Sequence, residues 1–219
     1  NKIDDVNIWI NELNSWFHKE LNEYINNPTV GGITKKRKAY NIIDYVIPKE
    51  KSISVVHANN LKNGNGKHIN KNVSKILNKY GIKNIITGHK PHGDCPLVIR
   101  DKNITAISAD TSYSNVNYLR EKNKIEGDNR GNAVSEVLLY SNGYIKIHGK
   151  YANNTKYSYL LKERANEKNM ELNDYIGMQL NNKYWIKNIK KDKFLISYGK
   201  DYELYEKWIS LKEVKELLK

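Results

Sequence analysis

The chain has 219 residues, enough for one large domain or for one domain with a small appendage. Its single cysteine, Cys95, excludes a disulfide framework and a cysteine-based zinc cluster within the chain. No apolar run approaches the roughly 20 residues of a membrane-spanning helix, so we expect no membrane partner and a cytoplasmic location. The chain starts at Asn1 without a signal segment, and we treat it as a fragment of a longer protein.

The net charge of +13 raises the hypothesis of nucleic-acid binding. A nucleic-acid interface usually concentrates positive charge on one face or arm, whereas the basic residues of this chain are spread along its length. The one tight basic cluster covers residues 35–38 and is typical of a solvated loop. We therefore expect no nucleic-acid partner.

The first part of the chain alternates helical and extended patterns. Apolar residues at helical spacing predict a helix at the N-terminal end, and a later one ends at Gly81, which suits a helix C-terminus. Two short apolar runs between polar loops predict strands, and a histidine follows each run. The predicted helices cover 6–25 and 70–80, and the predicted strands cover 52–56 and 84–87.

The pattern then becomes that of β-hairpins. Strands are predicted over 97–99 and 104–109, joined by a turn, and the Asn142-Gly143 pair is a strong signal for a second hairpin. The strands of that second hairpin are predicted over 133–140 and 144–148, after a long polar loop over 111–131.

The character changes after residue 150. A weak helical phrase covers 159–167, and four short strands with tight turns follow it. Ser210 with Glu213 forms a capping box that predicts a last helix to residue 218. We expect one domain over 1–150 and a small β-rich, SH3-like module over 151–219. The four strands are predicted over 175–180, 184–189, 193–198 and 203–207.

Two histidine-bearing loops are the candidates for chemistry. His57 follows one predicted strand and His89 follows another, with His92 three residues further on. Strand–helix–strand units place the ends of both strands at one edge of a sheet, where ligands collect, so the loops predict a metal or phosphate site. A nucleophilic thiol at Cys95, close to these histidines, is a further hypothesis.

Four stretches of the chain carry a family resemblance. They are Val-Val-His-Ala at 55–58, Ile-Ile-Thr-Gly-His-Lys-Pro-His-Gly at 85–93, Ile-Ser-Ala-Asp-Thr-Ser at 107–112 and Arg-Gly-Asn-Ala-Val-Ser-Glu-Val-Leu-Leu-Tyr at 130–140. Their order and spacing over roughly 5–150 resemble the second half of a calcineurin-like metallophosphoesterase. The family's Asp-x-His, Gly-Asp-x-x-Asp and Gly-Asn-His motifs do not occur here. The resemblance therefore implies a missing N-terminal half, on a preceding segment or another chain.

The resemblance implies an α+β fold in which helices pack on a β-sandwich, here the C-terminal half of the αββα domain. It implies a hydrolase with two divalent metal ions (Mn²⁺, Fe²⁺ or Zn²⁺) that cleaves a phosphorylated substrate: a phosphoprotein, a nucleotide or a dinucleoside polyphosphate. On this resemblance His57 and His89 are metal ligands, and His92 is the catalytic residue that contacts the scissile phosphate. Residues that support the ligands or shape their loops would be Asn59, Asn60, Asp94 and Asp110.

The alternative function is a non-catalytic binding module. In that interpretation the phosphatase half is a scaffold, and the basic surface and the small β-rich module bind nucleic acid or a protein partner. The sequence upstream of Asn1 would discriminate between the two, because the enzyme requires the missing metal-binding motifs.

Overall fold

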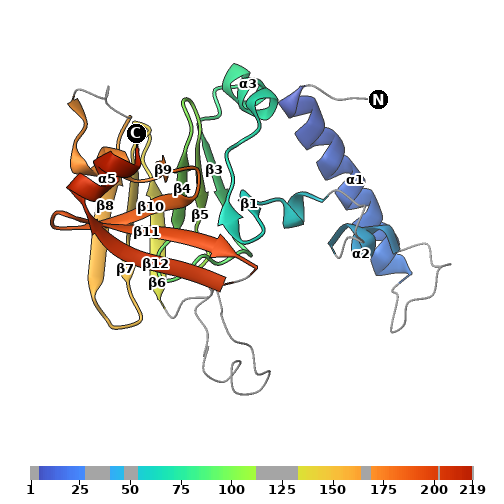
Figure 1. Cartoon of the computed structure of the whole chain (residues 1–219). Helices are drawn as coiled ribbons and strands as arrows, with labels where there is room; N and C mark the ends of the chain where they lie inside the picture. The colour runs from blue at the N-terminus through green and yellow to red at the C-terminus, as the bar shows by residue number, and fades with distance from the viewer. Residues whose placement is uncertain are drawn as a thin grey trace. The chain divides into compact units, whose positions relative to one another are not determined.

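A computed structural model describes residues 5–27, 40–46, 54–111, 133–163, 169–201 and 203–218 (Figure 1). The chain divides into two compact units, Asn1–Ala58 with Lys75–Tyr80, and Asn59–Ser74 with Gly81–Lys219. Helices and several small sheets make a mixed α+β structure, which agrees with the coarse class predicted. The basic cluster at 35–38 and all but the first residue of the loop predicted over 111–131 lie outside the described residues. None of the described helices is both long and apolar enough to span a bilayer.

The first unit is helical. Its helix α1 (Val6–Asn26) confirms the predicted N-terminal helix, and the side chain of Asp5 caps it by accepting hydrogen bonds of 2.9 and 3.0 Å from backbone N–H groups. The Tyr80 hydroxyl donates to the second oxygen of the same carboxylate over 2.5 Å. Helix α2 (Tyr40–Val46) contacts α1.

The strand predicted over 52–56 is wrong where the structure describes it. Val55–His57 forms the short 3₁₀ helix η1, which begins where the Ser54 hydroxyl accepts a hydrogen bond from the Val56 N–H. Adjacent valines favour a strand, but a strand also needs a neighbour to pair with, and no described strand pairs here. His57 therefore does not stand at the end of a strand.

The second unit begins with a short hairpin, β1 (Leu61–Lys62) and β2 (Asn65–Gly66). Helix α3 (Lys71–Lys79), whose residues divide between the two units after Ser74, confirms the second predicted helix, and Gly81 follows it with a φ of +70°. A three-stranded sheet comes next, in which β5 pairs in parallel with β3 and antiparallel with β4. Its strands are β3 (Asn84–Thr87), β4 (Leu97–Arg100) and β5 (Thr105–Ser108).

A second sheet is antiparallel in the order β6-β7-β8, and its first two strands confirm the hairpin predicted at Asn142-Gly143. Its strands are β6 (Val134–Leu139), β7 (Ile145–Lys150) and β8 (Lys156–Leu161). The helical phrase predicted over 159–167 is wrong at its start, because those residues pair with β7 as part of β8. The predicted domain boundary at residue 150 falls between these two paired strands.

The third sheet is antiparallel in the order β12-β11-β10-β9. The strand predicted over 175–180 is shorter than expected, because η3 (Leu172–Tyr175) occupies its start. The predicted last helix is confirmed as α5 (Leu211–Leu217), with the capping box of Ser210 and Glu213 formed. The strands are β9 (Gln179–Leu180), β10 (Tyr184–Lys190), β11 (Lys193–Lys200) and β12 (Glu203–Ser210).

One apolar core joins all three larger sheets. It includes Ile107 from the first, Ile147 from the second and Phe194 from the third, each fully buried, and Val214 of α5 closes it. Because burial of apolar side chains favours folding, this shared core stabilises the strands before and after residue 150 as one structure. The loop that leads from β3 to β4 is thereby held next to the C-terminal sheet.

Candidate functional site

The loop between β3 and β4 carries three of the predicted site residues, His89, His92 and Asp94. His89 follows the end of β3 with a φ of +66°, a left-handed conformation that non-glycine residues adopt rarely, and its side chain is exposed. The Ser108 hydroxyl, at the end of β5, donates to the Lys90 carbonyl over 2.7 Å and so ties the loop to the neighbouring strand.

Asp110 lies at the same edge of the first sheet as His89. The strands β3 and β5 are parallel, so the carboxyl ends that precede the two residues point the same way. The backbone N–H of Ala109 continues the pairing by donating to the Thr87 carbonyl over 2.9 Å. The sequence analysis expected His57 and His89 to meet at such an edge, whereas the strand ends that share it here precede His89 and Asp110.

His57 lies in the other compact unit and ends the 3₁₀ helix η1, so it does not follow a strand of the described part of the chain. Its Nε2 is 2.6 Å from the carbonyl oxygen of Val46. A carbonyl only accepts, so Nε2 is the donor in this contact. The convergence of His57 and His89 on a shared metal stays a prediction.

The two asparagines after His57 lie at the start of the second unit. The side-chain oxygen of Asn59 accepts a hydrogen bond of 2.9 Å from the Leu61 N–H, which turns the chain into β1. The carbonyl of Asn60 accepts from the Lys67 N–H over 2.8 Å, and its side-chain nitrogen is buried without a partner. Both residues shape the β1–β2 hairpin.

His92 is completely buried, and neither of its ring nitrogens has a hydrogen-bond partner in the structure. Burial, together with the nearby charge of Lys187, lowers the pKa of His92 well below its ordinary value. The imidazole is therefore neutral at physiological pH. In this conformation the ring is out of reach of a substrate, so the predicted contact with phosphate would require the loop to open.

The residues after His92 are fixed as well. A carboxylate oxygen of Asp94 accepts a hydrogen bond of 3.1 Å from the Ala152 N–H, which follows β7. Cys95 is completely buried, and burial raises its pKa to about 12. At neutral pH the thiol is protonated, which is unfavourable for the nucleophilic thiol considered above.

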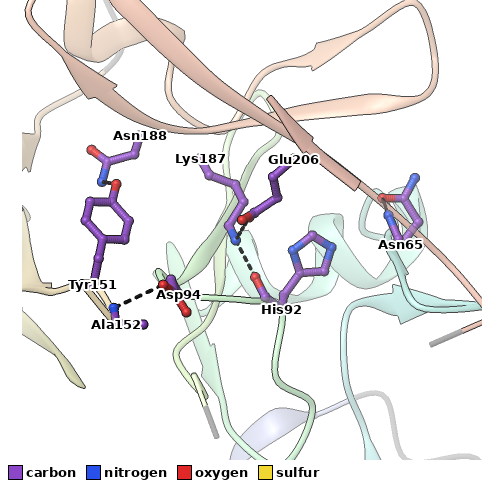
Figure 2. Close-up of polar contacts among 9 residues, drawn as sticks. Asn65, His92, Asp94, Tyr151, Ala152, Lys187, Asn188 and Glu206 are labelled. Atoms are coloured by element: carbon purple, nitrogen blue, oxygen red, sulfur yellow. Dashed lines mark hydrogen bonds and ion pairs between the residues drawn. The ribbon is translucent and has the colours of Figure 1, made fainter. Parts of the chain in front are cut away.

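A buried ion pair, which the sequence analysis missed, lies against this loop (Figure 2). Lys187 of β10 is completely buried, and its Nζ lies 2.6 Å from Oε1 of Glu206 on β12. The same ammonium group donates to the backbone carbonyl of His92. Burial acts to lower the pKa of Lys187, but the carboxylate charge of Glu206 and the hydrogen bond to it raise the pKa, and the net shift is upward. Lys187 is therefore charged in the folded protein.

The sequence held a signal for this burial. Within the strand predicted over 184–189, Lys187 alternates with Trp185 and Ile189, which places a lysine on an apolar face. In the structure the register between β10 and β11 shifts between Ile186 and Asn188, so Lys187 is the extra residue of a β-bulge. Bulges redirect side chains, and this one turns an ammonium group toward the loop.

Within the described ranges, no three His, Cys, Asp or Glu side chains gather into a group that could hold a metal ion. The described donors therefore do not form a complete metal site. Comparison with family models, with curated proteins and with solved structures yields no match to this chain.

Proposed function

We propose that the chain is the C-terminal half of a metal-dependent phosphoesterase that hydrolyses a phosphorylated substrate, with a β-sandwich of the αββα type. The observation that carries the proposal is the pairing of β3 with β5, which leads an exposed His89 and Asp110 to the same edge of one sheet. Histidine is the commonest metal ligand in proteins. Ligands of open α/β sheets bind at the carboxyl ends of the strands, which is where His89 lies.

Exposed apolar side chains on α1 support the idea of a missing half. Trp9 is 42% exposed, Phe17 is 40% exposed and Ile25 is 64% exposed. Apolar groups gathered on one element often mark a surface that another part of the protein covers. The missing half would also supply the carboxylate ligands of the family's Asp-x-His and Gly-Asp-x-x-Asp motifs.

In the proposed reaction the residues of this chain bind and orient. His89 would hold a metal ion through an imidazole nitrogen, and Ser108 fixes the His89 loop through the Lys90 carbonyl. The metal ions, when bound, supply a hydroxide at neutral pH and neutralise charge on the phosphoryl group. His92 is buried and neutral, and it would stabilise the packed conformation of the β3–β4 loop.

A first experiment tests His89 as a ligand in the chain itself. Mn²⁺ is titrated into the isotopically labelled chain, and the histidine side-chain resonances are followed by NMR. We expect the His89 resonance to broaden first, while that of His18, an exposed histidine of α1, stays sharp and serves as the internal control. Equal broadening of both would contradict a specific site at His89.

A second experiment tests catalysis after the missing half is supplied, as a longer protein or as a second chain. Hydrolysis of p-nitrophenyl phosphate with Mn²⁺ should fall by more than the roughly 10–100-fold typical of a ligand-supporting residue when His89 is replaced by Ala. Cys95→Ala is the control and should retain the rate, because a hydroxide is the proposed nucleophile. A robust metal-dependent rate from residues 1–219 alone would overturn the assignment of the site.

A second candidate function, single-stranded nucleic-acid binding, rests on the C-terminal sheet. The rings of Tyr198 and Tyr205 stack across β11 and β12 with centroids 6.2 Å apart, and Tyr205 is 53% exposed. The Lys183 ammonium lies 4.6 Å from the Tyr198 ring centroid. Aromatic rings interleaved with lysines are typical of surfaces that stack bases.

Fluorescence anisotropy with a labelled single-stranded RNA separates the two functions. The phosphoesterase proposal predicts weak, sequence-independent binding, with a Kd of about 10⁻⁴ to 10⁻⁶ M at physiological salt. Submicromolar binding that Tyr205→Ala abolishes would favour the second candidate.

A further inference from the structure

The ammonium group of Lys187, the bulge residue of β10, donates hydrogen bonds to two groups from different parts of the fold. One is the carboxylate of Glu206, 2.6 Å away on β12, and the other is the backbone carbonyl of His92 in the β3–β4 loop (Figure 2). The lysine side chain is fully buried, whereas that of Glu206 is 26% exposed. An ammonium group is costly to bury, and that cost is met only while both partners are in place.

The loop fits closely against this ion pair. Gly93, the residue after His92, has a φ of +81°, and a Cβ built on it would lie 3.1 Å from Oε1 of Glu206 and 3.2 Å from Nζ of Lys187. Two residues further on, Cys95 is completely buried. The segment from His92 to Cys95 is thus packed directly on the pair.

We propose that Lys187, with Glu206 as its counter-charge, is a positioning residue that locks the β3–β4 loop onto the C-terminal sheet and so fixes how His89 is presented. The locking itself follows from contacts within the second unit, whereas its consequence at His89 rests on the proposed function. The C-terminal strands would then be part of the site's support, and not a separate accessory module.

Cys95 provides a direct reporter, because it is the single cysteine of the chain and lies in the locked segment. Its reaction with a disulfide reagent such as DTNB under native conditions requires the loop to open. Lys187→Met keeps an unbranched chain but removes the ammonium, and leaves the His92 carbonyl without its donor. We expect labelling of Cys95 to become about 10- to 100-fold faster, as expected for loss of a buried hydrogen-bonding partner.

Two control variants separate loop opening from general loss of stability. Lys190→Met makes the same substitution on the same strand at an exposed position, and should leave the labelling rate unchanged. Val214→Ala removes methyl groups from the buried core at α5, leaves Lys187 and Glu206 unchanged, and gives the effect of global destabilisation. If Val214→Ala accelerates labelling as much as Lys187→Met does, the locking role is refuted.

A double-mutant cycle tests whether the two charges act together. Glu206→Gln leaves the buried ammonium without a counter-charge, so labelling should again accelerate. The double variant Lys187→Met/Glu206→Gln buries no charge, and its acceleration should fall well short of the product of the two single effects. Purely multiplicative effects would show that the two residues act independently and would overturn the proposal.

The consequence at His89 is read from the Mn²⁺ titration, compared between wild type, Lys187→Met and Val214→Ala. We expect the concentration that half-broadens the His89 resonance to rise by about 10- to 100-fold in Lys187→Met alone, the range for residues that orient metal ligands. An unchanged concentration with accelerated Cys95 labelling would overturn the positioning of His89. If wild type shows no effect of Mn²⁺ on His89, the proposed function fails, while the labelling data still decide the locking role.

Discussion

Gly93→Ala should destabilise the second unit through two separable costs. The first is conformational: Gly93 has a φ of +81°, where a residue with a Cβ costs about 1–2 kcal/mol more than glycine. The second is steric: the new Cβ would lie 2.5 Å from Cδ2 of Leu204 and close to the ion pair of Lys187 and Glu206. Leu204 is half-buried and can rotate away, so its close contact adds little. The atoms of the ion pair, at 3.1 and 3.2 Å, need to shift by only a few tenths of an ångström, so the steric cost falls toward the lower end of the roughly 1–3 kcal/mol for overpacking.

The expected total for Gly93→Ala is about 2–4 kcal/mol in the free energy of unfolding. Gly143→Ala is the matched control, because Gly143 has a φ of +84° in the β6–β7 turn but no atom within 4 Å of a built Cβ. That variant should lose only the conformational cost. Urea unfolding followed by tryptophan fluorescence measures both, with an unchanged denaturant slope as the sign that only stability has changed. Equal losses in the two variants would refute the close packing of the loop.

Three further predictions follow from single groups. Because folding lowers the pKa of His92, the unfolded chain binds the proton more readily, so stability should fall as the pH drops below about 6.5. Replacing His92 with Phe should reduce the slope of unfolding free energy against pH, measured by urea unfolding between pH 7.5 and 5.5, by up to about 1.4 kcal/mol per pH unit. Parallel profiles for the two proteins would contradict a buried neutral ring. With a pKa raised to about 12, Cys95 should be about one part in 10⁴ thiolate at pH 8 while it is buried, so native labelling should be far slower than labelling in denaturant. Equal rates would mean that the thiol is exposed. Ser210→Ala should lower the free energy of unfolding by about 1 kcal/mol, because it removes the cap of α5, and thermal unfolding measures this loss. Ser158→Ala, on β8, is the control and should have little effect. No loss in Ser210→Ala would show that α5 does not depend on its capping box.

Local signals in the sequence determined many of the elements. The cap at Asp5, the Asn142-Gly143 turn and the Ser210 capping box each act over a few residues, and the structure forms α1, the β6–β7 hairpin and α5 where these signals predict them. In each case neighbouring backbone groups find their hydrogen-bond partners within a short stretch, so no distant part of the chain is needed to specify the element.

Tertiary structure decided what those signals could not. The valines before His57 favour a strand by propensity but form a 3₁₀ helix, and the weak helical phrase from residue 159 begins as strand β8 because β7 offers it a partner. The same reasoning applies to the candidate site. The parallel pairing of β3 with β5, which sets His89 and Asp110 at one edge, arises only in the folded sheet.

The burial of His92 and Lys187 depends on groups far apart in the sequence. A one-residue bulge in β10 directs the lysine inward, where a carboxylate from β12 and a carbonyl from the β3–β4 loop receive its ammonium group. A charged side chain is stable in the core only if such partners converge on it, and their convergence is a property of the packed sheets. The sequence alone therefore determined which residues are available for chemistry, and the packing of the C-terminal sheet decided which of them are exposed and which are buried.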